Sequence, residues 1–196
     1  MTMKKLDSVI GTQHTAKNSQ TGTLAIVSGA AALTQRETTM ALARLKGRNP
    51  SGTNLSLLSS LKQQGVSLEP EFDNRYEVKK WHVTLADDVN LAEAGRILKL
   101  AMVSMPPEEM EKALLASMML MTKQPGDTPA DCAMRCKLYA AQMVDWPADI
   151  FDHVLRVIVK HHKWWPSFSD FYKEYEWMVK PRKKMVSALD GLPFHG

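Results

Sequence analysis

Apolar residues recur at helical spacing through the second half of the chain. Between Leu91 and Met102 they fall three or four positions apart, which places them on one face of a helix. The same spacing returns up to about residue 180, and a proline-containing turn separates each stretch from the next. Because short connections favour antiparallel neighbours, the pattern predicts an all-α fold, a compact bundle of about five short helices. The interrupting turns are Met105-Pro106-Pro107, Gln124-Pro125-Gly126, Trp146-Pro147 and Trp164-Trp165-Pro166.

The first half of the chain carries a weaker pattern. Residues 1–66 are rich in polar side chains and have little apolar surface to bury, so we expect a partly flexible N-terminal arm. Two short helices are expected within it. The first would run from a capping box at Thr34 to Gly47, and the second from Thr53 to Gly65.

The remaining segments are expected to connect or to end the helical domain. Residues 67–89 predict a linker, with a weak alternation over 76–85 that fits one short strand or an extended segment. The last helix is expected to end near Val179, because Pro181 follows it. The predicted organisation is therefore an arm at 1–66, a linker at 67–89, a helical domain at 90–180 and a basic C-terminal tail at 181–196.

Charge is distributed unevenly along the chain. The net charge is +4, made up of +6 over residues 1–62, −5 over 63–150 and +3 over 151–196. Basic ends around an acidic middle fit contact with nucleic acid, and they fit equally well an arm that folds onto an acidic partner. No run of roughly 18 apolar residues occurs, and no apolar stretch follows the charged start. We therefore expect a cytoplasmic protein without membrane contact.

Catalytic motifs are missing from the sequence. It contains no phosphate-binding Gly-Lys-Ser/Thr loop, no nucleophile elbow and no His-Glu-x-x-His. Cys132 and Cys136 lie one helical turn apart, but a zinc site needs about four ligands and no further cysteine exists. They are interpreted as helical thiols. We expect a protein that is not an enzyme and that uses no cofactor, metal or small-molecule substrate.

Two short segments combine positive charge with aromatic residues. The cations of the first are expected to contact phosphate or an acidic patch, and the second could hold single-stranded nucleic acid by charge and stacking. In the first, one tryptophan is expected to anchor a turn and the other to be an exposed binding residue. Each segment also has a purely structural interpretation, in which the cations complement helix ends or solubilise a tail and the aromatics belong to the core. The candidate binding residues are Lys160, His161, Lys163, Trp164 and Trp165 in the first segment, and Lys180, Arg182, Lys183 and Lys184, just after Tyr172, Tyr175 and Trp177, in the second.

The stretch from Glu109 to Trp177 resembles a known family. It places Trp146-Pro147 before one helix and the turn Lys163-Trp164-Trp165-Pro166 before another that starts Ser167-Phe168-Ser169-Asp170. This outline is similar to the small helical domain of phage and prophage replication proteins that load or inhibit the hexameric replicative helicase. The resemblance implies a non-catalytic DNA replication adaptor in a bacterial host cell. Its protein partner would be that helicase, which would supply the ATP hydrolysis, and single-stranded DNA would be a further partner.

Two other functions are compatible with the same residues. The chain could be a nucleic-acid-binding regulatory protein, or a small inhibitor of a host or defence complex. Helix-turn-helix motifs at turns 146–147 and 164–166 are disfavoured, because these turns contain proline. In addition, the helix after Pro166 carries three carboxylates against one lysine, which suits a DNA groove poorly.

Overall fold

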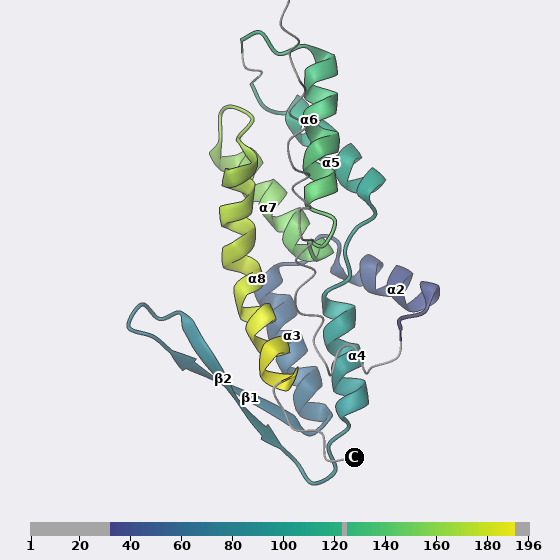
Figure 1. Ribbon diagram of the computed structural model, residues 1–196, viewed down its shortest axis with the longest axis vertical. Coiled ribbons are helices and arrows are strands. Elements are labelled where there is room, and N and C mark those ends of the chain that lie inside the picture. The colour runs from purple at the N-terminus through teal and green to yellow at the C-terminus, as the bar shows by residue number, and fades with distance from the viewer. Residues whose placement is uncertain (1–31, 123–124, 191–196) are drawn as a thin grey trace, which may run out of the picture.

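The computed structural model describes residues 32–122 and 125–190, and this part of the chain is mostly helical. It contains seven helices and one two-stranded antiparallel sheet, so the all-α prediction is wrong. Figure 1 shows an elongated molecule in which the hairpin lies against one end of a group of helices. The elements are α2 (Gln35–Leu45), α3 (Pro50–Gln63), β1 (Val66–Phe72), β2 (Val78–Leu85), α4 (Leu91–Ala101), α5 (Pro107–Met119), α6 (Pro129–Gln142), α7 (Ala148–His161) and α8 (Phe168–Asp190).

The hairpin lies where the linker was expected. β1 contains Pro70, which pairs with Trp81 of β2, and a proline weakens any strand pattern in a sequence. Proline is tolerated here because both strands of a two-stranded sheet are edge strands. The hairpin is held by burial of Val66, Leu68 and Trp81 against helices, a tertiary effect that the local sequence did not predict.

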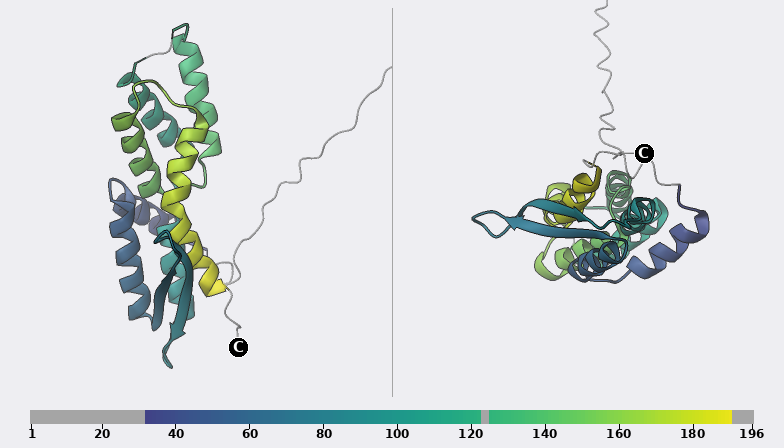
Figure 2. Two further views of the ribbon diagram at one scale, coloured as in Figure 1. Left: turned by 90° about the vertical axis from the view of Figure 1, so that its left-hand side faces the viewer. Right: turned by 90° about the horizontal axis from the view of Figure 1, so that it is seen from below.

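The buried apolar residues form two cores. One lies among α2, α5, α6, α7 and the first half of α8, and it contains the aromatic residues Trp146, Trp165 and Phe171. The other lies among α3, the hairpin, α4 and the second half of α8. Helix α8 runs along both halves of the molecule, as two views show (Figures 1 and 2). It is therefore the element that both cores share.

Helix α8 is longer than predicted. The expected end near Val179 is wrong, because the helix passes through Pro181 and continues to Asp190. A proline inside a helix costs about 3 kcal/mol, and here the burial of Met185, Val186 and Leu189 in the second core offsets it. Residues 181–190 of the predicted tail are thus part of a packed helix, and residues 191–196 lie outside the described part.

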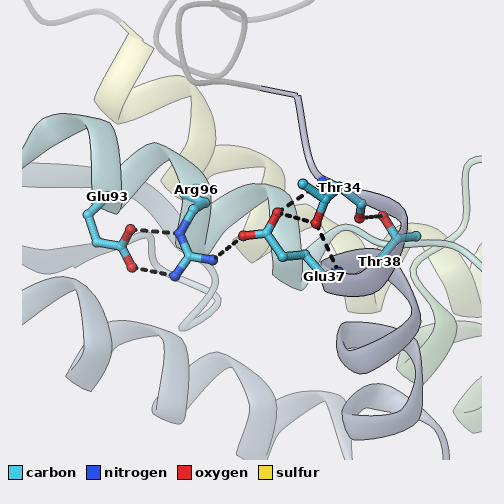
Figure 3. A network of polar contacts seen from close by, with 5 residues as sticks. All are labelled: Thr34, Glu37, Thr38, Glu93 and Arg96. Atoms are coloured by element: carbon cyan, nitrogen blue, oxygen red, sulfur yellow. Dashed lines mark hydrogen bonds and ion pairs between the residues drawn. The ribbon is translucent and has the colours of Figure 1, made fainter.

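The predicted helix starts agree better with the structure. The capping box at Thr34 is present, with the Glu37 carboxylate accepting from the Thr34 amide at 2.9 Å (Figure 3). Asn90 and Thr128 also cap their helices as predicted. The second helix of the arm begins at Pro50 rather than Thr53, and residues 1–31 of the arm lie outside the described part. Among the described helices, none has both the length and the apolar character needed to cross a membrane.

A buried ion pair lies where the two cores meet. Arg182 of α8 and Asp149 of α7 are both 0% exposed, and their side chains are joined by hydrogen bonds of 3.0 and 2.9 Å. Arg182 also donates to the Ala101 carbonyl at 2.6 Å and to Asn54 Oδ1 at 3.0 Å. One side chain therefore ties α8 to α3, α4 and α7.

Candidate nucleic-acid interface

A basic groove runs between β2 and the second half of α8. Its volume is about 570 Å³. Strand β2 contributes Lys79, Lys80 and His82, and α8 contributes Lys184 and Ser187. Lys79, Lys80 and His82 are exposed, and Lys184 is partly buried. We call this hollow the β2–α8 groove.

A second hollow of about 280 Å³ adjoins this groove on the surface of α8. It is lined by Lys180, Lys183 and Tyr172 among others, and it shares Lys184 and Ser187 with the β2–α8 groove. Tyr172 is 44% exposed at this hollow. Five lysines and one exposed ring thus line one continuous surface.

Local geometry places these lysines together. Lys180, Lys183, Lys184 and Ser187 are spaced three and four residues apart, so a continuous helix presents them on one face. That face exists only because α8 continues through Pro181. On β2, a register irregularity pairs Lys80 with Glu71 and the next matched pair is Val78 with Phe72, so Lys79 is an extra residue.

Carboxylates neutralise part of this positive charge. Glu71 binds Lys79 at 2.8 Å and His82 at 3.1 Å, and Glu77 binds Lys180 at 2.5 Å. The hydrogen bond from Lys79 lowers the pKa of Glu71, and the bond to Glu71 raises the pKa of Lys79. The pKa of Lys180 is raised by its hydrogen bond to Glu77. Both lysines stay charged at neutral pH. Glu176 also lines the hollow on α8, so five lysines face three carboxylates, those of Glu71, Glu77 and Glu176.

The remaining lysines have other contacts. The Lys183 ammonium lies 5.4 Å from the ring centroid of Tyr175, within cation–π range. Lys184 donates to the Val78 carbonyl across the groove. No ion pair occupies Lys80 among the described residues. Lys80 and Lys183 are therefore the two lysines most available to an anionic ligand.

In the second basic segment, the structure places the lysines at the surface but buries Arg182. Lys180 and Lys183 are exposed and line the surface described above, together with Lys184. Arg182 is fully buried, so its assignment as a ligand-binding residue is wrong. Helical geometry explains the difference, since residue 182 points to the opposite side of α8 from residues 180, 183 and 184.

The aromatic residues near that segment are divided between core and surface. Tyr175 is buried and stacks on Trp146 with ring centroids 4.0 Å apart, and burial raises its pKa to about 12. Trp177 is 56% exposed and Tyr172 is 44% exposed. The core interpretation thus applies to Tyr175, whereas Tyr172 and Trp177 are exposed and stay candidates for binding.

The first basic segment forms a separate surface. Lys160, His161, Lys163 and Trp164 are exposed where α7 leads into α8, and the Lys163 ammonium lies 5.4 Å from the Trp164 ring centroid. Trp165 is only 2% exposed and packs against Tyr139 and Phe171, so its assignment as a binding residue is wrong. The rise of a helix puts the start of α8 roughly 18 Å from Lys180, so the two segments do not form one site.

The residues that sequence reasoning missed are the basic ones of β2. Lys79, Lys80 and His82 alternate with Trp81 and Val83 in the segment that was predicted to be a linker or a short strand. Basic residues interleaved with apolar ones were the available signal. It was not recognised because the pairing partner of this strand was not predicted.

The described residues contain no group of three or more His, Cys, Asp or Glu side chains placed to hold a metal ion. Cys132 and Cys136 are buried, and burial raises the pKa of the Cys136 thiol to about 11. Comparisons of the chain with protein-family models, with characterised proteins and with solved structures found no match.

Proposed function

We propose that this protein is a non-catalytic nucleic-acid-binding protein that holds single-stranded DNA along the β2–α8 groove. The observation that carries the proposal is the convergence of Lys79 and Lys80 from β2 with Lys180, Lys183 and Lys184 from α8. These residues come from segments about 100 positions apart, so the fold itself assembles the basic surface. We place the protein in the cytoplasm of a bacterial cell, as its family resemblance implies.

The binding mechanism is electrostatic with a contribution from stacking. Lysines that neutralise phosphates release condensed counterions, so affinity falls with salt by about 0.7 logarithmic units per phosphate for a single strand. The exposed Tyr172 ring lines the same hollow as Lys183 and offers a base-stacking surface there. Neither contact reads sequence, so we expect binding with little sequence preference.

Fluorescence anisotropy with labelled oligo-dT tests this proposal. The double variant Lys80→Gln/Lys183→Gln should weaken binding and reduce the salt dependence, because each lost phosphate contact lowers the salt slope by about one unit or less. Lys173→Gln, on the first half of the same helix and 73% exposed, is the matched control and should bind normally. Equal affinities for the double variant and the control would contradict the proposal.

A second candidate function is the replication adaptor that binds a hexameric helicase. It is favoured by apolar side chains that α5 and α6 leave exposed in the part of the chain that carries the resemblance. Met134 and Leu138 lie one turn apart on α6 and are 59% and 54% exposed. Met119 and Leu120, at the end of α5, are 83% and 77% exposed. Exposed apolar groups of this kind mark protein-binding surfaces.

Size-exclusion chromatography with light scattering tests this second candidate. The protein mixed with a hexameric replicative helicase should elute as a complex of defined stoichiometry. Met134→Gln/Leu138→Gln should abolish that complex, whereas Lys137→Gln on the same exposed face of α6 should preserve it. Separate elution of the two unmodified proteins would exclude this candidate and leave the single-strand-binding proposal standing.

A further inference from the structure

Helices α2 and α3 are joined by a short turn, as the two helices of a helix-turn-helix unit are. Residues 46–49 join them, a turn of four residues in which Gly47 adopts a φ of +74°. Turns of this length that contain glycine are typical of DNA-binding helix pairs. Asn49 caps α3 and Pro50 occupies its first turn, so the second helix starts sharply. Figure 1 shows α2 steeply inclined to α3.

A third helix supports this pair. Helix α4 packs against both α2 and α3, and the Arg96 side chain of α4 reaches Glu37 of α2 at 2.9 Å. The buried face of α3 carries Thr53, Leu57 and Leu61, which fixes the opposite face towards solvent. We propose that this unit binds double-stranded DNA and that the solvent-facing side of α3 enters the major groove.

The exposed face of α3 has suitable chemistry for a groove. The helix contains neither aspartate nor glutamate, so nothing on it repels phosphate. Serine hydroxyls bond to either base of a pair, and an apolar side chain contacts the thymine methyl group. Leu55 is 69% exposed at the centre of this face. The other exposed residues of the face are Ser51, Gly52, Ser59 and Lys62.

Basic residues flank the start of α3. Arg156 of α7 donates to the Arg48 carbonyl at 3.4 Å, which brings α7 beside the turn. Lys160 follows Arg156 by one turn on the same exposed face of α7. Arg48, Arg156 and Lys160 are all exposed, and they are placed to contact phosphates on either side of the groove.

The carboxylates nearest to this turn are already engaged. Asp152 accepts from the Gly47 amide at 2.8 Å, and Glu109 binds Lys46 at 2.5 Å. The Asp152 carboxylate keeps its charge, because a backbone amide is neutral, and the Lys46–Glu109 pair is neutral overall. Positive charge is still in excess over these two carboxylates, because Arg48, Arg156 and Lys160 lie at the surface there as well. This surface shares no residue with the β2–α8 groove. It is therefore a separate site, for double-stranded rather than single-stranded DNA.

Binding to three labelled ligands tests the proposal: a DNA duplex, an RNA duplex of the same sequence, and oligo-dT. The DNA duplex should bind more tightly than the RNA duplex, because the A-form major groove is too narrow for side chains to read. Leu55→Glu should weaken DNA duplex binding by about tenfold or more, and Leu55→Gln should have a much smaller effect. Arg48→Gln/Arg156→Gln should lower the salt slope for duplex DNA by about two.

Two controls separate this surface from the β2–α8 groove. The variants of α3 and of the turn should leave oligo-dT binding unchanged, and Lys80→Gln/Lys183→Gln should show the reverse pattern. Circular dichroism and thermal unfolding confirm that each variant is folded. Failure to bind duplex DNA, or duplex binding that survives every variant of α3 and the turn, would overturn the proposal even where oligo-dT binding persists.

Discussion

Arg182 is a basic residue that follows Lys180 and precedes Lys183 and Lys184, yet its environment is the opposite of theirs. The sequence shows four cations in a row of five positions, and only helical geometry separates the buried one from the exposed ones. Pro181 made a continuing helix appear improbable from sequence. The role of Arg182 therefore could not be predicted before the length of α8 was known.

Removing one partner of the buried pair is expected to destabilise the fold strongly. Asp149→Asn should lower the free energy of unfolding by about 3–5 kcal/mol, because it leaves the Arg182 guanidinium buried without a counter-charge. The double variant Asp149→Leu/Arg182→Met should be less destabilised than Asp149→Asn. Urea denaturation measures the free energy of unfolding of both variants. If Asp149→Asn is as stable as the unmodified protein, the buried Asp149–Arg182 pair does not stabilise the fold.

The two adjacent tryptophans should also differ in their contribution to stability, because one is buried and the other exposed. Trp165→Ala is expected to lower the free energy of unfolding by about 3–5 kcal/mol, because a large side chain that is 2% exposed leaves a cavity. Trp164→Ala removes a ring that is 41% exposed and should have a much smaller effect. Thermal unfolding compares the two variants, and equal losses of stability would show that both rings belong to the core.

At the scale of single elements, helix starts were predictable, and one of the two strands matches the alternation seen over 76–85, but its partner strand was not predicted. Thr34, Asn90 and Thr128 cap their helices through bonds to residues three positions on, so the signal is contained in the local sequence. The strand with Pro70 pairs with one that follows it, and both depend on Trp81 packing against α8. The basic groove was consequently half predictable: its lysines on α8 were identified, and those on β2 were not.

The attachment of α2 to α4 is expected to depend on pH. The Arg96 guanidinium binds Glu93 at 2.6 Å and Glu37 at 2.9 Å, while Thr34 also donates to Glu37 (Figure 3). Hydrogen bonds from Thr34, and then from Arg96, hold the pKa of Glu37 below 4.5, and those from Arg96 do the same for Glu93. Carboxylates with lowered pKa values stabilise the fold above the unfolded pKa, and this contribution is lost as pH falls below it.

Arg96→Gln should therefore flatten the pH dependence of stability. The free energy of unfolding of the unmodified protein should fall as pH drops below about 4.5, and more steeply than in the variant. Denaturant unfolding at a series of pH values gives both curves. Arg36→Gln, an exposed change one residue from Glu37, is the control and should keep the original slope.

At the scale of the whole molecule, α8 is the only described helix that contributes several buried residues to each of the two cores. Its first half supplies Phe171, Tyr175 and Val179 to one core, and its second half supplies Met185, Val186 and Leu189 to the other. The two halves of the molecule therefore fold around one continuous element. The sequence predicted a helical domain flanked by an arm and a tail that do not pack on it. It contains no local signal for packing between α8 and elements about 100 residues earlier in the chain.

A chain that stops at Lys180 should lose the second core and retain the first. The truncation removes Arg182 and the three apolar residues of the last turns, which pack against α3, α4 and the hairpin. Hydrogen exchange should show rapid exchange over residues 50–100 and continued protection in α5 to α7. Uniform protection in the truncated chain would show that the second half of α8 is dispensable.

One turn of α8 carries the groove lysines on its outer side and Arg182 on its inner side, and this arrangement links ligand occupancy to folding. A polyanion that binds Lys180, Lys183 and Lys184 only when that turn is helical favours the folded state by mass action, by about 2.7 kcal/mol at a hundredfold excess over its dissociation constant. The relation is reciprocal: any change that loosens Arg182 from Asp149 lowers the apparent affinity of the outer surface. Saturation with nucleic acid should therefore raise the free energy of unfolding and keep the buried Asp149–Arg182 pair intact.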